Sequence, residues 1–456
     1  MNPAQVSFDT QVFSASILFF NADPSKAVAM EDAVEYYENG LLIVENGHIK
    51  AAGDYEQICK EYDLNSGDID ATYSSYLIIP GFVDTHIHYP QTEMIASYGE
   101  QLLPWLTNYT FPTEKKFKEP AYCKLIAEFF IDELLKNGTT TALVLGTVHA
   151  ESAEALFSAA DKKEMRLIAG KVMMDRNAPD ELVDTAQSSY DESEALIKKW
   201  HGHNRLLYAI TPRFAATSTR QQLVLAGNLK KKYPSVYLHT HLSESSEEVA
   251  WVKSLFPEAD SYLDVYDRAG LVTSKSIFAH AVHLEEQEYA LLHKKEAAVS
   301  FCPTSNLFLG SGLFKIREMK RSDRNVRIGL GTDVGAGTSF SMIQTLNEAY
   351  KVVSIEQNSA KPRLTMSAFE GFYHATLGGA NALCLDDKIG KLAKGYEADF
   401  VVLDFEATAL QKLRMRRVKD SPKSPIDSLS EKLFALMMMG DDRNIVATYV
   451  NGKKVF

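Results

Sequence analysis

Cysteine is scarce in this sequence. The four cysteines, Cys59, Cys123, Cys302 and Cys384, are widely scattered along 456 residues. This scatter offers no disulfide framework and no Cys-x-x-Cys zinc site. It suits a reducing compartment, and we therefore expect a cytoplasmic protein.

A net positive charge and long apolar runs are also lacking. The net charge is −12, whereas a dedicated nucleic-acid-binding protein usually has a basic face. No uncharged apolar stretch is long enough to cross a bilayer, and the start, MNPAQVSFDTQVF, lacks the basic and apolar regions of a signal peptide. We therefore expect no nucleic-acid partner and no membrane attachment. The 45% hydrophobic and 24% charged residues are typical of a globular protein.

Both ends of the chain are rich in β-forming residues. QVFSASILFFNA and SSYLIIP lie near the start, and ADFVVLDF and NIVATYVNGKKVF lie near the end, the last with an Asn-Gly turn. This pattern predicts a composite β-sandwich domain built from residues 1–80 and 385–456. The polar, proline-bearing residues 413–432 are expected to form a surface loop.

The middle of the chain, residues 81–384, alternates short apolar runs with longer amphipathic segments, as βα units do. Eight such runs predict an α/β fold of the (β/α)8 TIM barrel type. An open doubly wound sheet is the alternative, which is weakened because no Gly-rich phosphate loop follows the first strand. The expected strands lie within residues 81–88, 139–148, 166–175, 206–214, 236–244, 276–284, 297–306 and 327–335.

Several expected strands end in polar residues, the position of active sites in barrels. His86 and His88 are two residues apart, so both can face the same side of their strand. His241 and Asp333 end the fifth and eighth strands. Imidazoles with one carboxylate suit zinc or a related divalent ion, with zinc–nitrogen distances of roughly 2.0–2.1 Å. These four residues are the predicted metal ligands.

The other histidines are assigned no ligand role. His239 lies two residues deeper than His241, so we expect a core residue or one that supports a ligand. His201 and His203 repeat the spacing of the first pair in a polar junction and are expected to be solvated. Structural roles are expected for the remainder, His48, His149, His283, His293 and His374.

Several longer motifs resemble the guanine deaminase family of the amidohydrolase superfamily. They include PGFVDTHIHYPQ, GEQLLPWLTNYTFPTE, YAITPRFA, HTHLSE, FCPTSNLFLGSGLF and GLGTDVGAGTSFSM, and the resemblance covers nearly the whole chain. It implies one metal ion per chain, usually zinc with iron as the other possibility. It also implies hydrolysis of guanine to xanthine and ammonia, and a homodimer.

The resemblance also implies roles for individual residues. The metal ligands again fall on His86, His88, His241 and Asp333. Proton transfer falls on Glu244 and Asp333, with His280 as the barrel histidine beside the metal. The implied contacts to the purine come from His88, Gln91, Trp105, Leu106, Arg213, Phe214, His241, His280 and Asp333.

This residue set predicts a reaction sequence. A metal with an open coordination position lowers the pKa of bound water from about 15.7 to about 7, and the resulting hydroxide can attack the amino-bearing ring carbon. Asp333 can accept the proton of the water, and Glu244 can protonate the adjacent ring nitrogen. Arg213 can donate to a ring carbonyl, and Phe214 can stack on the ring.

Residue chemistry alone indicates only a deaminase or hydrolase of a planar polar ring. A related amidohydrolase acting on cytosine, a triazine or an adenosine derivative therefore stays open. A binuclear hydrolase needs a bridging carboxylated lysine, and Lys171 lies on the third expected strand, but the resemblance gives it no such role. A non-catalytic scaffold typically loses metal ligands, and none is lost here. The cysteine-ligated nucleobase deaminases are excluded by the missing Pro-Cys-x-x-Cys.

Overall fold

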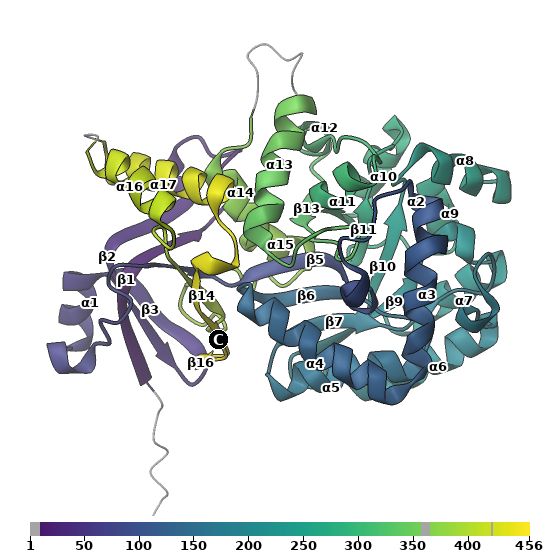
Figure 1. Cartoon of the computed structure of the whole chain (residues 1–456), viewed down its shortest axis with the longest axis horizontal. Helices are drawn as coiled ribbons and strands as arrows, with labels where there is room; N and C mark the ends of the chain where they lie inside the picture. The colour runs from purple at the N-terminus through teal and green to yellow at the C-terminus, as the bar shows by residue number, and fades with distance from the viewer. Residues whose placement is uncertain (1–9, 357–364, 421–422) are drawn as a thin grey trace, which may run out of the picture.

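The computed structural model describes residues 10–356, 365–420 and 423–456. A closed barrel lies beside a smaller β-sheet (Figure 1). The expectation of no signal peptide rests mostly on residues 1–9. These residues lie outside the described part of the chain. Among the residues that are described, no helix is both long and apolar enough to cross a membrane.

Eight parallel strands form the barrel, which confirms the predicted fold class. They pair in chain order, and pairing of β9 with β10 and of β13 with β5 closes the ring. Every residue of β5 and β6 is buried, which is why parallel strands appear in the sequence as continuous apolar runs. The strands are β5 (Phe82–His88), β6 (Thr139–Leu145), β7 (Arg166–Gly170), β9 (Leu206–Pro212), β10 (Tyr237–Leu242), β11 (Ser276–His280), β12 (Ala298–Phe301) and β13 (Arg327–Leu330), with β8 (Val172–Met173) pairing beside β9.

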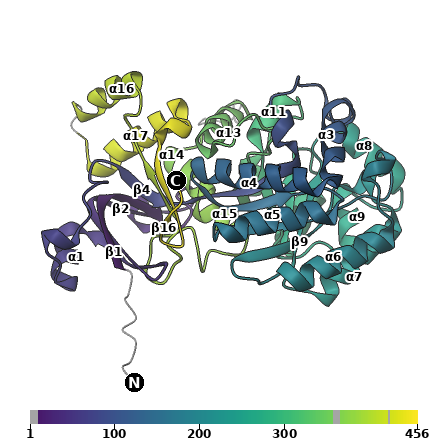
Figure 2. The same ribbon diagram turned by 60° about the horizontal axis from the view of Figure 1, so that its bottom comes forward.

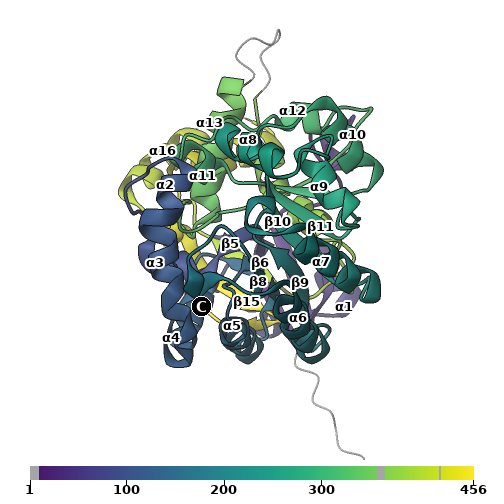
Figure 3. The same ribbon diagram turned by 90° about the vertical axis from the view of Figure 1, so that its right-hand side faces the viewer.

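Helices surround these strands (Figure 3). Helix α4 (Pro120–Lys136) starts with a proline, where the missing N–H is harmless. Its buried residues recur at helical spacing, so one face packs on the barrel. Gly138 then adopts a φ of +79°, as a helix terminus often requires. Other helices of this layer include α5 (Ala150–Lys162), α6 (Ala186–Trp200), α7 (Arg220–Lys232), α8 (Ser246–Leu255), α9 (Tyr262–Arg268), α10 (Glu286–Lys294), α11 (Pro303–Phe308) and α13 (Met342–Glu356).

The second sheet combines strands from both ends of the chain, as predicted (Figure 2). Strand β4 pairs with β1 on one side and with β14 on the other. Because β4 ends at Pro80 and β5 begins at Phe82, we keep domain boundaries at residues 80/81 and 384/385 as our proposal. The sheet comprises β1 (Thr10–Phe20), β2 (Val34–Glu45), β3 (His48–Asp54), β4 (Leu77–Pro80), β14 (Phe400–Leu403), β15 (Ile445–Val450) and β16 (Lys453–Lys454).

The expectation of a surface loop at residues 413–432 is wrong for the described residues of this range. Residues 421 and 422 are not described. Two helices, α16 (Ala409–Lys419) and α17 (Pro425–Met439), occupy this region. Pro425 stands in the first turn of α17, where proline starts a helix rather than breaking it. Leu429, Leu433 and Leu436 are buried in the main core, so tertiary packing supports α17.

A helical segment covers the mouth of the barrel. It runs from α2 (Leu102–Trp105) through a π-helical turn (Leu106–Thr110) into α3 (Phe111–Glu114). In Figures 1 and 3, α2 and α3 lie at the end of the barrel where β10 and β11 also end. This segment, residues 102–114, is called the cap below.

Candidate active site and metal centre

Four side chains bring one ligand atom each to a common point at the carboxyl ends of the strands. Nε2 of His86 lies 3.1 Å, and Nε2 of His88 3.3 Å, from Oδ1 of Asp333. The Nε2 atoms of His88 and His241 are 3.2 Å apart. Two ligands of a tetrahedral zinc ion with bonds of 2.0–2.1 Å are separated by roughly 3.3 Å. Potential ligand atoms of His86, His88 and His241 lie within 4.8 Å of one another, and Asp333 lies close to two of these histidines, so the structure brings the predicted ligands into one cluster.

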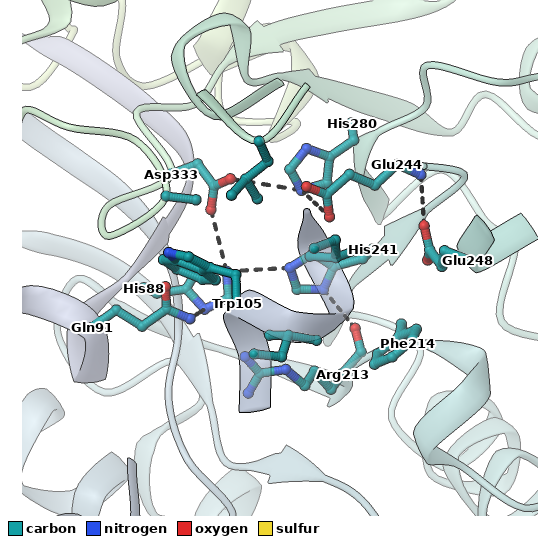
Figure 4. A pocket seen from close by; sticks show the side chains of 14 residues that line it. His88, Gln91, Trp105, Arg213, Phe214, His241, Glu244, Glu248, His280 and Asp333 are labelled. Carbon is teal, nitrogen blue, oxygen red and sulfur yellow. Dashed lines mark hydrogen bonds and ion pairs between the residues drawn. The ribbon is translucent and has the colours of Figure 1, made fainter. Parts of the chain in front are cut away.

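The protonation of His241 also suits a metal ligand. Burial, together with the charge of neighbouring groups, holds the pKa of His241 well below its usual value, so the ring is neutral. Its Nδ1 lies 2.6 Å from the carbonyl oxygen of Arg213, which can only accept, so Nδ1 carries the proton. The bare Nε2 lone pair consequently faces His88 (Figure 4).

The other two histidines of the predicted ligand set are also held at their second nitrogen. Nδ1 of His86 lies 2.7 Å from Nε2 of His239, and Nδ1 of His88 lies 3.1 Å from the side-chain amide of Gln91. Such contacts fix the orientation of metal-binding imidazoles. His239 therefore occupies the position of a supporting residue, one of the two roles that its depth in the strand suggested.

Unusual backbone conformations turn several side chains of the site into place. His280, at the end of β11, has a φ of +72°, and Asp333, just beyond β13, has a φ of +52°. Ser243, directly before Glu244, has a φ of +49°. Non-glycine residues adopt this left-handed region at a cost of about 1–3 kcal/mol and do so preferentially at functional sites. The sequence contains no glycine or asparagine at these positions that would have signalled the conformation.

Glu244 and His280 form a buried ion pair beside the ligand cluster. Oε2 of Glu244 lies 3.4 Å from Nε2 of His280, which lies 3.7 Å from Oδ2 of Asp333 (Figure 4). Burial raises the pKa of Glu244 to about 7, with the opposing effect of His280 too small to cancel it. Burial alone would lower the pKa of His280, but Glu244 and Asp333 outweigh it and raise the value. A buried carboxyl group that binds a proton near neutral pH is suited to acid–base catalysis.

A second glutamate, which the sequence analysis missed, holds Glu244 in place. Oε2 of Glu248 accepts hydrogen bonds from the backbone N–H groups of Glu244 (2.8 Å) and Ser245 (3.3 Å). Its Oε1 accepts one from the hydroxyl of Tyr262 at 2.7 Å. Ser245 and Glu248 form the capping box of α8. The Ser-x-x-Glu spacing was a usable sequence signal for this arrangement.

A pocket lined by both polar and apolar side chains lies over the ligand cluster. Arg213 and Phe214 follow β9 and are only 2% and 4% exposed, so Arg213 is not a surface arginine. The lining includes all nine residues implied to contact the purine: His88, Gln91, Trp105, Leu106, Arg213, Phe214, His241, His280 and Asp333.

Comparison with known proteins agrees with this site. Residues 77–455 match the model of the amidohydrolase family. This chain belongs to the amidohydrolase family. Amidohydrolases are typically metal-dependent, which accords with the cluster of histidine and aspartate ligands.

Three proteins named guanine deaminase are similar to this chain along almost their whole length. Guanine deaminase of Escherichia coli (strain K12) is 52% identical over 424 residues, covering 93% of this chain and 92% of that protein. The crystal structure of guanine deaminase from Bradyrhizobium japonicum matches with a TM-score of 0.94 and 38% identity, over 98% and 99% of the two chains. Guanine deaminase from C. acetobutylicum, solved with bound guanine in the active site, matches with a TM-score of 0.87 and 30% identity, over 98% and 100%.

Lys171 does not act as a bridging ligand in this amidohydrolase structure. Its side chain is fully buried and forms ion pairs with Asp184 and, at 3.1 Å, with Glu192. These two carboxylates account for a buried ammonium group. The binuclear alternative therefore has no support from Lys171.

Cys302 lies close to the ligand cluster, which its position in the sequence did not indicate. Its sulfur lies within 4.8 Å of potential ligand atoms of His86, His280 and Asp333. Burial raises the pKa of the Cys302 thiol well above its usual value.

The expectation that His201 and His203 are both solvated holds only for His203, which is exposed. His201 is partly buried at the end of α6. Its Nδ1 accepts a hydrogen bond from the backbone N–H of Tyr208, and its Nε2 lies 3.0 Å from the hydroxyl of Ser235. These contacts give His201 a structural role.

Proposed function

We propose that this chain hydrolyses guanine to xanthine and ammonia. The observation that carries the proposal is a pocket whose lining combines Arg213 and Glu244 with the predicted metal ligands His88, His241 and Asp333. Relatives named guanine deaminase, similar over almost the whole chain, support the same substrate. A cytosine, triazine or adenosine substrate is not favoured.

His86, His88, His241 and Asp333 are proposed to hold one divalent ion per chain, zinc or alternatively iron. The donor set of three imidazoles and one carboxylate suits both metals. When bound, the metal lowers the pKa of a water molecule and so supplies the nucleophile. Removal of any one ligand should therefore abolish both metal binding and turnover.

Two carboxyl groups of opposite protonation state are proposed to move the protons. Burial alone would raise the pKa of Asp333, but His86 and His280 outweigh it and keep the value low, so Asp333 is an anion that can accept the proton of the water. Glu244, with a pKa of about 7, can donate to the ring nitrogen beside the amino-bearing carbon. The proton held by Asp333 then passes to the amino group, which leaves as ammonia, while the hydroxyl proton returns to Glu244.

The ring is proposed to be held by its edges and its face. Arg213 donates to the carbonyl oxygen of guanine, and Gln91 reads the opposite edge. Phe214 packs against the face of the ring, while Trp105 and Leu106 of the cap exclude water from it. Adenine has no carbonyl at the position that Arg213 reads, so the pocket should discriminate against it.

We infer that the enzyme works in the cytoplasm as a homodimer. All four cysteines are free thiols, which agrees with a reducing compartment. The homodimer rests on the resemblance to the family. Light scattering of the purified protein measures the mass and so tests it.

The test of function is ammonia release by purified protein from a panel of rings, with metal analysis of the same sample. Guanine should be deaminated, with about one metal ion per chain. Adenine, cytosine and an aminated triazine should release ammonia far more slowly. Faster release from any of these than from guanine would refute the substrate assignment.

A further inference from the structure

Arg213 is paired inside the protein with a glutamate that the reaction sequence above does not use. Nη1 of Arg213 donates to Oε1 and Oε2 of Glu114 at 2.9 and 2.8 Å. Glu114 is fully buried and Arg213 is 2% exposed. The side-chain amide of Gln91 lies 3.5 Å from Oε1 of the same carboxylate. Glu114 therefore contacts both polar groups proposed to read the ring.

The same carboxylate joins the cap to the barrel. Glu114 ends α3, and the cap that it terminates also contributes Trp105 and Leu106 to the pocket. The π-helical turn within the cap is a rare feature that is frequent at functional sites. The ring of Phe111 lies 5.8 Å from the guanidinium carbon of Arg213. One ion pair thus fixes the polar and apolar walls of the pocket relative to each other.

The pairing also determines the charge of the pocket wall. A buried guanidinium without a partner attracts an anion strongly, because no water screens it. With Glu114 in place, the ion pair is neutral overall, while Nη2 and Nε of Arg213, which lines the pocket, are donors that the bonds from Nη1 to Glu114 do not use. Such donors suit the oxygen of a neutral carbonyl, and they offer little extra attraction to an anionic ring.

We infer that Glu114 is a positioning residue that makes the pocket select a neutral ring over an anionic one. This inference rests on the proposed function, in which guanine enters as a neutral ring. The product xanthine loses a proton more readily than guanine does. Glu114 would therefore also limit retention of the ionised product.

The test compares the parent enzyme with Glu114→Gln, which keeps the size of the side chain and removes its charge. The dissociation constant of xanthine is measured by calorimetry on the acid and alkaline sides of the ionisation of xanthine. In the parent, the neutral form should bind at least as tightly as the anion. In Glu114→Gln, the preference for the anion should rise by about tenfold or more, as expected for a charge-assisted hydrogen bond.

Kinetics provide a second readout that a purely structural role would not produce. Because the metal ligands and Glu244 are untouched, Glu114→Gln should raise KM for guanine several-fold and change kcat less. Glu93→Gln is the matched control, since Glu93 pairs with Lys116 near the cap but is half exposed. That control should leave both the xanthine preference and KM unchanged.

Two results would overturn the inference. One is a folded Glu114→Gln protein with the same preference between xanthine forms as the parent. The other is a parent enzyme that itself prefers the anion, which is decisive even if the variant does not fold. Failure of the parent to deaminate guanine would instead refute the proposed function, and xanthine binding would still report on Glu114.

Discussion

Nε2 of His239 lies 2.7 Å from Nδ1 of His86, on the side of the His86 ring opposite the nitrogen that faces Asp333. This contact orients His86, a predicted metal ligand. His239 itself does not line the pocket. Substitution His239→Phe removes the partner and should weaken metal affinity by about 10- to 100-fold. Chelator competition measures the affinity, and His239→Gln, which can still accept a hydrogen bond, should lose less. Equal affinities of His239→Phe and the parent would show that the contact is dispensable.

Removal of a predicted metal ligand should lower the metal content of the protein. His88→Ala takes one of four donor atoms from the cluster, and we expect metal content and guanine deamination to fall together. Elemental analysis and ammonia release measure the two quantities on one sample. His293→Ala is the matched control, because His293 lies exposed on α10. Full activity of His88→Ala without bound metal would contradict the ligand assignment.

Substitution of Glu244 should separate catalysis from metal binding. Glu244→Gln keeps the shape of the side chain but cannot transfer a proton. We expect about one metal ion per chain and a kcat lower by about 100-fold or more. Glu247→Gln, on the exposed side of the first turn of α8, should behave as the parent does. Loss of metal from Glu244→Gln would mean that Glu244 is a ligand.

The activity should depend on pH through Glu244. Burial raises the pKa of this carboxyl to about 7, so its acid form, the proton donor, is lost as the pH rises through this value. We expect kcat/KM to decline on the alkaline side with a midpoint near this pKa. The negative charge of Glu248 contributes to the raised value, so Glu248→Gln should move the midpoint to lower pH. An unchanged midpoint in Glu248→Gln would show that the alkaline decline of kcat/KM does not report on Glu244.

Arg213 should control the choice of ring. Arg213→Met removes a charge-assisted donor, which should lower kcat/KM for guanine by about 10- to 150-fold. Turnover of 2-aminopurine, which lacks the carbonyl, should change little. Equal losses on both rings, or no loss on either, would show that Arg213 does not read the carbonyl.

The Arg213→Met experiment needs a control for Glu114, the ion-pair partner of Arg213. Arg213→Met leaves Glu114 buried and unpaired, and breaking such a pair lowers the free energy of unfolding by about 3–5 kcal/mol. The double variant Arg213→Met/Glu114→Gln removes both charges and should recover part of that stability. It should not recover guanine turnover, since the donor is still absent. Chemical denaturation measures the stability of all three proteins.

The sequence by itself determined the barrel and was sufficient to predict a set of metal ligands. Parallel strands buried on both faces must be apolar throughout, so eight such runs between amphipathic segments were recognisable without coordinates. His86 and His88 could be paired because side chains alternate along a strand. The helices α16 and α17 were not predicted because their polar residues and Pro425 suggested a loop. The leucines of α17 are buried only because the folded chain packs them into the core.

Only the tertiary structure decided which residues support the ligands and the ring-binding groups. Glu114 and Arg213 are 99 positions apart, and His86 and His239 are 153 positions apart; neither pair has a local pattern that joins its members. The pKa of Glu244 is likewise set by burial, which depends on the elements packed around it rather than on its neighbours in the chain. Side-chain periodicity is a local property that a sequence displays, whereas partner choice, burial and the resulting charge arise only when distant segments meet.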